Sequence, residues 1–182
     1  MNRWFWLLVF FSLSSTCFAD TILLKSGKTI EAKIVEKECD SGNTDACMSL
    51  ATNRFSHGTI QEALVYWKKA CEAEDLDGCY QLGHFSQPEG GESKLAIGKL
   101  KAFCQEKKYE ACADLGNLIA TEDQVESMRL LKLACDSDNI NGCLSLGYRA
   151  KVDGDISTAE KAYQRACDLG DFGGCNSLKT LK

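Results

Sequence analysis

Histidine, proline and long apolar runs are scarce in this chain of 182 residues. The two histidines, His57 and His84, lie 27 positions apart, and no C-x-x-C motif occurs. Zinc sites usually combine closely spaced cysteines with histidine, so these absences argue against a metal centre, and we expect no cofactor. No apolar run reaches the roughly 20 residues that a membrane-spanning helix needs.

Positive charge and catalytic motifs are also lacking. The chain has 21 lysines and arginines against 26 aspartates and glutamates, a net charge of −5. Nucleic-acid-binding domains usually carry a basic patch or stripe, so we expect no nucleic acid partner. The sequence contains no G-x-S-x-G, H-E-x-x-H or G-x-x-x-x-G-K-[ST] motif, which removes the common signatures of hydrolases, metalloproteases and phosphate-binding enzymes.

Cysteine, by contrast, is abundant and regularly spaced. Ten of the eleven cysteines form five pairs with seven residues between the members, and the pairs recur every 31 to 33 residues. A period of this length is typical of a supersecondary unit that is copied along the chain and stacked on its neighbours. The five pairs are Cys39/Cys47, Cys71/Cys79, Cys104/Cys112, Cys135/Cys143 and Cys167/Cys175.

The spacing within a pair constrains the backbone if its cysteines are bonded. Eight steps along one helix would separate the alpha carbons by about 12 Å, whereas a disulfide tolerates about 4.4 to 6.8 Å. The chain must therefore reverse between the two sulfurs, and turn-forming residues such as those at 40–45 and 136–139 agree. We expect structural disulfides within each pair; metal ligation and reactive thiols are the alternatives.

The N-terminus predicts an oxidising destination. A basic start that includes Arg3 precedes an apolar run at 4–11, and small side chains at Cys17 and Ala19 suit signal-peptide cleavage. We therefore expect residues 1–19 to be a secretory signal peptide, with export to the periplasm or outside the cell. Cleavage after Ala19 would also remove the unpaired cysteine. In the alternative, Cys17 is the acylated residue of a lipoprotein.

The repeat pattern predicts two helices per unit. The second cysteine of each pair begins the pattern C-x-x-L, which is usually followed by a small residue. This pattern indicates the first helix of each unit, at 45–56, 77–85, 109–120, 141–152 and 173–181. A second helix precedes each of the last four first-of-pair cysteines, with a small residue eight positions back and a bulky one four positions back. Capping-box patterns at Thr59, Thr121 and Ser157 indicate where three of these second helices begin.

The segment before the first pair differs in composition. Residues 21–25 and 29–35 are rich in β-branched side chains and flank a Ser-Gly-Lys turn, so we expect an N-terminal cap at 20–37 folded as a β-hairpin. The alternative continues the helical repeat, because Val35 lies four residues before Cys39, where other copies have a bulky residue. The repeat domain then covers residues 38–182.

A motif of the form A-C-D-x-G-[D/N]-x-x-G-C-x-S-L-G is legible at 166–178 and 134–147. It resembles the bacterial cysteine-rich SEL-like repeat proteins, relatives of tetratricopeptide repeats, over about Cys39 to Lys182. The resemblance implies an all-α, α/α superhelical solenoid with one disulfide per repeat, four full helix pairs and a terminal helix. It also implies export and the binding of a protein or peptide. The third unit is degenerate at 103–108, and the family's usual G-x-G-V loop is missing.

Some members of that family carry a claim of penicillin binding or β-lactamase activity. Serine β-lactamases need S-x-x-K, and no serine here has lysine three residues later; K-T-G is absent as well. An S-D-N triplet at 137–139 lies between paired cysteines, where turn-forming residues are expected anyway. We therefore expect a non-catalytic protein without catalytic residues, and a β-lactamase or other cell-wall-peptide hydrolase is the alternative.

Stacked repeats of this kind present one helix of each pair on a concave face. Large or polar side chains on the first helices are therefore the candidates for contact with a protein or peptide ligand, and we expect the protein to be a monomer. Ordinary solvated side chains are the alternative for each candidate. The candidates are Arg54, Tyr80, Gln81, Asn117, Tyr148 and Arg149.

Overall fold

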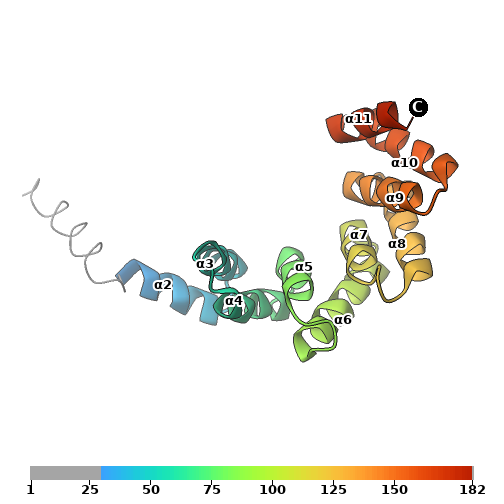
Figure 1. Ribbon diagram of the computed structural model, residues 1–182. Coiled ribbons are helices and arrows are strands. Elements are labelled where there is room, and N and C mark those ends of the chain that lie inside the picture. The colour runs from blue at the N-terminus through green and yellow to red at the C-terminus, as the bar shows by residue number, and fades with distance from the viewer. Residues whose placement is uncertain (1–29, 182) are drawn as a thin grey trace, which may run out of the picture.

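The computed structural model describes residues 30–181, which form ten helices and no strand (Figure 1). Four helix pairs follow an initial helix, and a single helix ends the series. The helices are α2 (Ile30–Asp40), α3 (Thr44–Ser56), α4 (Ile60–Glu72), α5 (Leu76–Phe85), α6 (Gly91–Gln105), α7 (Tyr109–Leu118), α8 (Gln124–Asp136), α9 (Ile140–Val152), α10 (Ile156–Asp168) and α11 (Phe172–Thr180). The expected first helices agree with α3, α5, α7, α9 and α11 to within two residues at either end.

The helices stack into a curved solenoid. The first helices α3, α5, α7, α9 and α11 lie along the inner side of the curve, and the second helices α4, α6, α8 and α10 lie along the outer side (Figure 1). Each helix packs against the next one in the chain, and α7 also packs against α5 and α9 along the inner side. The predicted all-α superhelix with one disulfide per repeat is confirmed.

A disulfide closes every turn from a second helix to the following first helix. The five bonds are Cys39–Cys47, Cys71–Cys79, Cys104–Cys112, Cys135–Cys143 and Cys167–Cys175, and they bring the paired alpha carbons to between 4.4 and 4.8 Å of each other. The reversal of the chain within each pair therefore has the geometry that the spacing required.

The backbone of each closed turn is left-handed at one position, three residues after the first cysteine, where φ is positive. Two of these positions are glycine, which adopts that conformation without strain. The five positions are Gly42, Glu74, Lys107, Asp138 and Gly170.

The residue after the left-handed position begins the next helix. Its backbone N–H donates to the carbonyl of the residue before the first cysteine, which ends the preceding helix in the manner of a Schellman motif. In four turns its side chain also caps the new helix, accepting a hydrogen bond from the backbone N–H three residues later. Those four residues are Asn43, Asp75, Asn139 and Asp171; Lys108 occupies the place in the degenerate third turn and provides no side-chain cap.

The core lies between the two layers of helices. The small residues eight positions before the first cysteine of a pair are fully buried; they are Ala63, Ala96, Ser127 and Ala159. The bulky residues four positions before the same cysteines are at most 5% exposed. Small residues of the first helices let these bulky groups approach. A Cβ atom added at Gly147 would lie 2.6 Å from the ring of Tyr163, too close for any real contact.

The prediction of a second hairpin strand at 29–35 is wrong from Ile30 onward, because these residues form the helix α2. This helix occupies the place of a second helix, so the repeat architecture begins before residue 38. Val35 packs against the core beside the buried Cys39, which favours the helix over the strand preference of β-branched residues. The expected signal peptide at 1–19 and the first expected strand lie outside the described residues. Among residues 30–181, no helix combines the length and apolar character required to cross a membrane.

None of the three expected capping boxes forms, although the start of α4 at Thr59 is as predicted. Asp123 caps α8 by accepting from the backbone N–H of Glu126 at 2.9 Å, and Asp155 caps α10 by accepting from that of Thr158 at 3.0 Å. Thr59 does precede α4, but its hydroxyl donates to the carbonyl of Arg54 at 2.7 Å instead of capping. A carboxylate suits a helix N-terminus at least as well as a hydroxyl, because the helix dipole adds to the hydrogen bond.

Candidate binding surface

The six side chains predicted for the concave face all belong to first helices. Arg54 lies on α3, Tyr80 and Gln81 on α5, Asn117 on α7, and Tyr148 and Arg149 on α9, and these helices form the inner layer of the curve (Figure 1). Tyr148 is the most exposed, at 62%, and the other five are half-buried. The structure therefore places all six on the same layer of the solenoid, with differing availability.

The second cysteines of the pairs lie on the same first helices, but most of them face the core instead of the inner surface. Cys47, Cys112 and Cys143 are 0% exposed, as is Cys79. A side chain without accessible surface has no contact to offer a ligand, and a sulfur in a disulfide is neither a free thiol nor a metal ligand. Cys47, Cys112 and Cys143 are therefore structural residues of the core and take no part in an accessible site.

Arg149 links two neighbouring inner helices. Its Nη2 donates to the backbone carbonyl of Asn117 at 3.5 Å, which joins α9 to the C-terminal end of α7. The buried Nε of Arg149 has no hydrogen-bond partner among the described residues. Arg149 is thus held against α7 by one hydrogen bond.

Arg54 is directed toward its own helix pair. Its Nε lies 3.2 Å from Oε2 of Glu62 on α4, and its backbone carbonyl accepts the hydroxyl of Thr59. The side chains of this ion pair are 43% and 56% exposed, so the attraction between them is weak. Arg54 therefore supports the junction of α3 and α4, and a ligand would have to compete with Glu62 for it.

An aromatic cluster connects the core with the inner side of α5. The ring of Trp67, only 3% exposed, stacks on Phe85 with centroids 5.2 Å apart, and Phe85 meets His84 at 4.8 Å. His84 in turn stacks on Tyr80 at 5.7 Å. Trp67 is thus a core residue. The same packing orients Tyr80 and His84.

Asp114 is a candidate that sequence reasoning missed. Burial, followed by the negative charges of Glu110 and Asp77, raises the pKa of its carboxyl from 3.8 to about 7. Burial also raises the pKa of Tyr80, with a further contribution from Asp114. A signal was present, because Asp114 lies two residues after a second cysteine, the same place that Gln81 has in its own copy. Near neutral pH this carboxyl can donate as well as accept a hydrogen bond.

Each member of the S-D-N triplet has a structural task. Ser137 is the C-cap residue of α8, Asp138 pairs with Arg165, and Asn139 caps α9 by accepting from Gly142 N–H at 2.7 Å. The backbone of Ser137 and the side chains of Asp138 and Asn139 therefore stabilise the local structure. Within the part of the chain that the structure describes, no three His, Cys, Asp or Glu side chains gather as metal ligands would, and the ten paired cysteines are consumed in disulfides.

Comparison with known proteins places the fold. No protein-family model and no curated protein matches the chain. A protective antigen of uropathogenic Escherichia coli that displays an SLR fold is similar at 21% identity, with a TM-score of 0.55 over 82% of this chain. A Sel1 repeat protein from Oxalobacter formigenes is similar at 20% identity, with a TM-score of 0.57 over 83% of this chain.

The chain is shorter than both of these proteins. The matched region covers 35% of the Escherichia coli protein and 69% of the Oxalobacter formigenes protein. At these identities the likeness concerns the fold, which agrees with the helix pairs and disulfide-closed turns described above. The chain therefore has the architecture of a SEL-like repeat solenoid.

Proposed function

We propose that this protein is an exported, disulfide-stabilised scaffold that binds another protein or a peptide along the inner face of its solenoid. In this proposal it is a monomer and performs no chemistry. The Sel1-repeat fold supports a role in protein binding, because stacked helix pairs create an extended concave surface for side-chain contacts. Five disulfides are consistent with an oxidising compartment outside the cytosol.

One observation carries the proposal: the polar and aromatic side chains of the inner face are held in place before any ligand arrives. Tyr80 and His84 are oriented by aromatic packing that reaches Trp67, and Arg149 is oriented by Asn117. Immobilising a flexible side chain on binding costs about 0.5 to 1.5 kcal/mol, and this surface has already met part of that cost on folding.

A site-specific crosslinker tests the proposal. A photoreactive amino acid replaces the exposed Tyr148 on the inner helix α9, and in a matched control it replaces the exposed Lys94 on the outer helix α6. Illumination of the producing cells should attach a discrete protein or peptide to the Tyr148 position and not to the Lys94 position. Equal labelling of both positions, or labelling of neither, contradicts inner-face binding.

Export has a separate test. We propose that residues 1–19 are removed and that the mature chain begins at Asp20. Mass spectrometry of the protein isolated from the producing cell should give an N-terminal peptide that starts at this residue. A lipid-modified N-terminal cysteine at position 17 would instead support the lipoprotein alternative, and an intact Met1 would contradict both.

The alternative function, a β-lactamase-type hydrolase, is tested with purified oxidised protein and a chromogenic cephalosporin. Heat-inactivated protein provides the blank. Turnover that exceeds the blank and follows the folded protein through purification would replace the scaffold proposal with an enzymatic one. A rate equal to the blank retires the β-lactamase alternative.

A further inference from the structure

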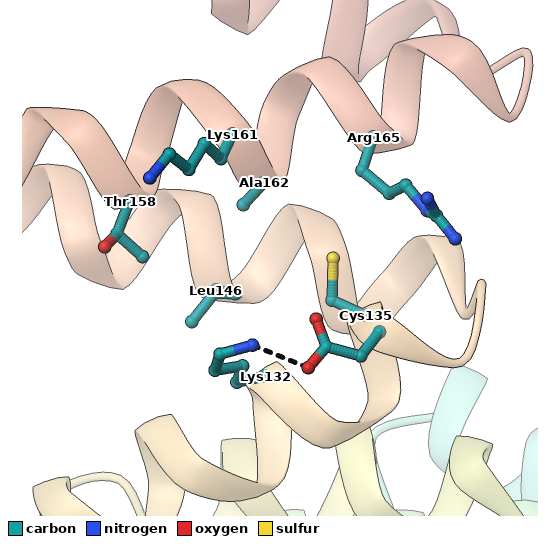
Figure 2. A pocket seen from close by; sticks show the side chains of 8 residues that line it. Lys132, Cys135, Leu146, Thr158, Lys161, Ala162 and Arg165 are labelled. Atoms are coloured by element: carbon teal, nitrogen blue, oxygen red, sulfur yellow. Dashed lines mark hydrogen bonds and ion pairs between the residues drawn. The ribbon is translucent and has the colours of Figure 1, made fainter.

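A cavity of about 600 Å³ opens between the outer helices α8 and α10, with α9 behind it (Figure 2). It lies between the third and fourth helix pairs and includes none of the inner-face candidates. Lys132 approaches it from α8, and Lys161 and Arg165 approach it from α10. The full lining is Lys132, Cys135, Asp136, Leu146, Thr158, Lys161, Ala162 and Arg165.

A single small residue explains why the cavity is here. Five residues before the first cysteine, the other second helices carry Tyr66, Lys99 and Leu130, whereas α10 carries Ala162. The long side chains reach back toward the preceding unit: the hydroxyl of Tyr66 donates to Glu36 on α2 at 3.1 Å, and Nζ of Lys99 lies 3.7 Å from Glu74. Ala162 is too short to do the same, so space remains between α10 and α8.

The rim of this space is cationic, although the chain as a whole has a net charge of −5. Three cations line it against one acid, Asp136. Nζ of Lys132 contacts Asp136 at 2.6 Å, and Arg165 pairs with Asp138. Lys161 differs from both, because no hydrogen bond or ion pair joins its ammonium group to another described residue. The cavity therefore keeps one cation without a direct ion-pair partner among residues 30–181, although the negative charge of Asp155 lies near enough to interact with it.

The floor of the cavity is apolar. Leu146 is 6% exposed, Ala162 3% and Cys135 5%, and the sulfur of Cys135 points toward the space between the helices (Figure 2). The hydroxyl of Thr158 is already committed as a donor to Asp155 at 2.6 Å. The lining thus offers cationic donors at the rim and carbon and sulfur below, a combination that suits a carboxylate attached to an apolar group better than a bare anion.

We propose that this cavity is a second binding site, which takes an acidic peptide segment that presents a carboxylate beside an apolar side chain. The carboxylate pairs with Lys161, with support from Arg165 and Lys132, and the apolar side chain rests on Leu146, Ala162 and the disulfide of Cys135. The site is independent of the inner face, because its helices and residues are different. A partner that carries such a segment could be held from the outer side of the solenoid.

The test uses the full oxidised protein and a fluorescent peptide that alternates leucine and glutamate. Its control peptide has glutamine in place of every glutamate. Fluorescence anisotropy should show that only the acidic peptide binds, with an affinity that falls as salt rises, because exposed charges are screened. Equal binding of both peptides, or no binding of the acidic one, overturns the proposal.

Two variants locate the site. Lys161→Gln removes a cation without breaking an ion pair, and it should weaken binding about tenfold, the worth of one charge-assisted hydrogen bond. Lys94→Gln makes the same change of charge on α6, away from the cavity, and should leave the affinity unaltered. Equal effects of the two substitutions would show that overall charge, and not this cavity, attracts the peptide.

Ala162→Leu tests the cavity itself by restoring the bulk that Leu130 provides in the third helix pair. The variant should melt at or above the wild-type temperature and should lose peptide binding. A folded Ala162→Leu protein that still binds the peptide overturns the proposal. Inorganic phosphate provides a last comparison: if it displaces the peptide at equal concentration, the apolar floor contributes nothing and the site is a general anion site.

Discussion

The buried hydroxyl of Ser127 donates a hydrogen bond to the backbone carbonyl of Gly116 at 2.6 Å. Gly116 lies in the last turn of α7, where carbonyls lack a partner within the helix. The other three second helices have alanine at the position of Ser127. Ser127 therefore fills the same small socket and also satisfies a buried acceptor, which links α8 to the end of α7.

Replacing Ser127 with alanine should destabilise the protein even though alanine suits this position elsewhere. The carbonyl of Gly116 would be left buried and unpaired, which costs about 1 to 3 kcal/mol. Urea unfolding of Ser127→Ala measures the loss, and Ser157→Ala, at an exposed position of α10, is the control. If the two variants unfold at the same urea concentration, the hydrogen bond contributes no net stability.

Replacing Lys107 with glycine should stabilise the degenerate third turn. Lys107 has a φ of 66°, a left-handed conformation that costs a side-chain-bearing residue about 1 to 2 kcal/mol. Glycine relieves that strain but makes the unfolded chain more flexible, so the expected net gain is about 1 kcal/mol or less.

Asp138 provides the comparison, since it has a φ of 65° in the fourth turn. Aspartate tolerates this conformation, and Asp138 also pairs with Arg165. Asp138→Gly should therefore bring no gain. Thermal melts of both variants check the pair, and a loss of stability in Lys107→Gly would show that its backbone is not strained.

Asp114 should make stability depend on pH. The pKa of its carboxyl is raised to about 7 in the folded protein, so the folded state holds this proton more tightly than the unfolded state does. Its contribution to stability is therefore most favourable below about pH 4 and declines as the pH rises to about 7.

Asp114→Asn removes this dependence. The variant should match the wild type near pH 3 and exceed it at pH 8, by about 1 to 2 kcal/mol once solvent screening of this partly exposed group is allowed for. Urea unfolding at the two pH values gives the difference, with Glu89→Gln at an exposed loop position as control. An Asn variant that is less stable than wild type at pH 8 contradicts the prediction.

The five disulfides should differ in how readily they are reduced. Both cysteines of the last pair, Cys167 and Cys175, are half-buried, whereas Cys71 and Cys79 are fully buried. Because thiol–disulfide exchange requires access to a sulfur, the last pair should open first. Stepwise reduction, alkylation and mass spectrometry give the order.

The energetic effect of that first opening can be measured as well. A disulfide that closes so short a loop contributes about 2.5 kcal/mol in the chain-entropy model. The double variant Cys167→Ser/Cys175→Ser should lose stability of that order at most, since its repeat is at the end of the solenoid. Alkylation of Cys71 and Cys79 before Cys167 and Cys175 would contradict the predicted order of reduction.

The fold was largely predictable because the cysteines mark both ends of every turn. Their spacing located α3, α5, α7, α9 and α11, and the small and bulky residues before Cys71, Cys104, Cys135 and Cys167 indicated which faces would be buried. The helix starts at α8 and α10 were less predictable, since Asp123 and Asp155 competed with nearby hydroxyls for the cap. The β-branched residues of α2 favoured a strand until the packing of Val35 was known.

The surfaces were harder to infer than the fold. Sequence position placed Tyr148 and Arg149 on the inner layer, but the ion pair of Arg54 with Glu62 depends on how a long side chain turns. The perturbed carboxyl of Asp114 depends on charges from a neighbouring helix. The cavity beside Ala162 exists because this position lacks the long side chain that Tyr66, Lys99 and Leu130 provide in the other copies. The missing side chain leaves a cavity only when the helices are stacked.

The short reach of each disulfide has a consequence for how the protein matures. Each of the ten paired cysteines bonds to the one eight residues away, so none of these bonds has to wait for a distant part of the polypeptide. A chain that enters an oxidising compartment end first can close its loops one after another as they emerge. Mispaired isomers, which trap many cysteine-rich proteins, are disfavoured here because the correct mate is always the nearest thiol.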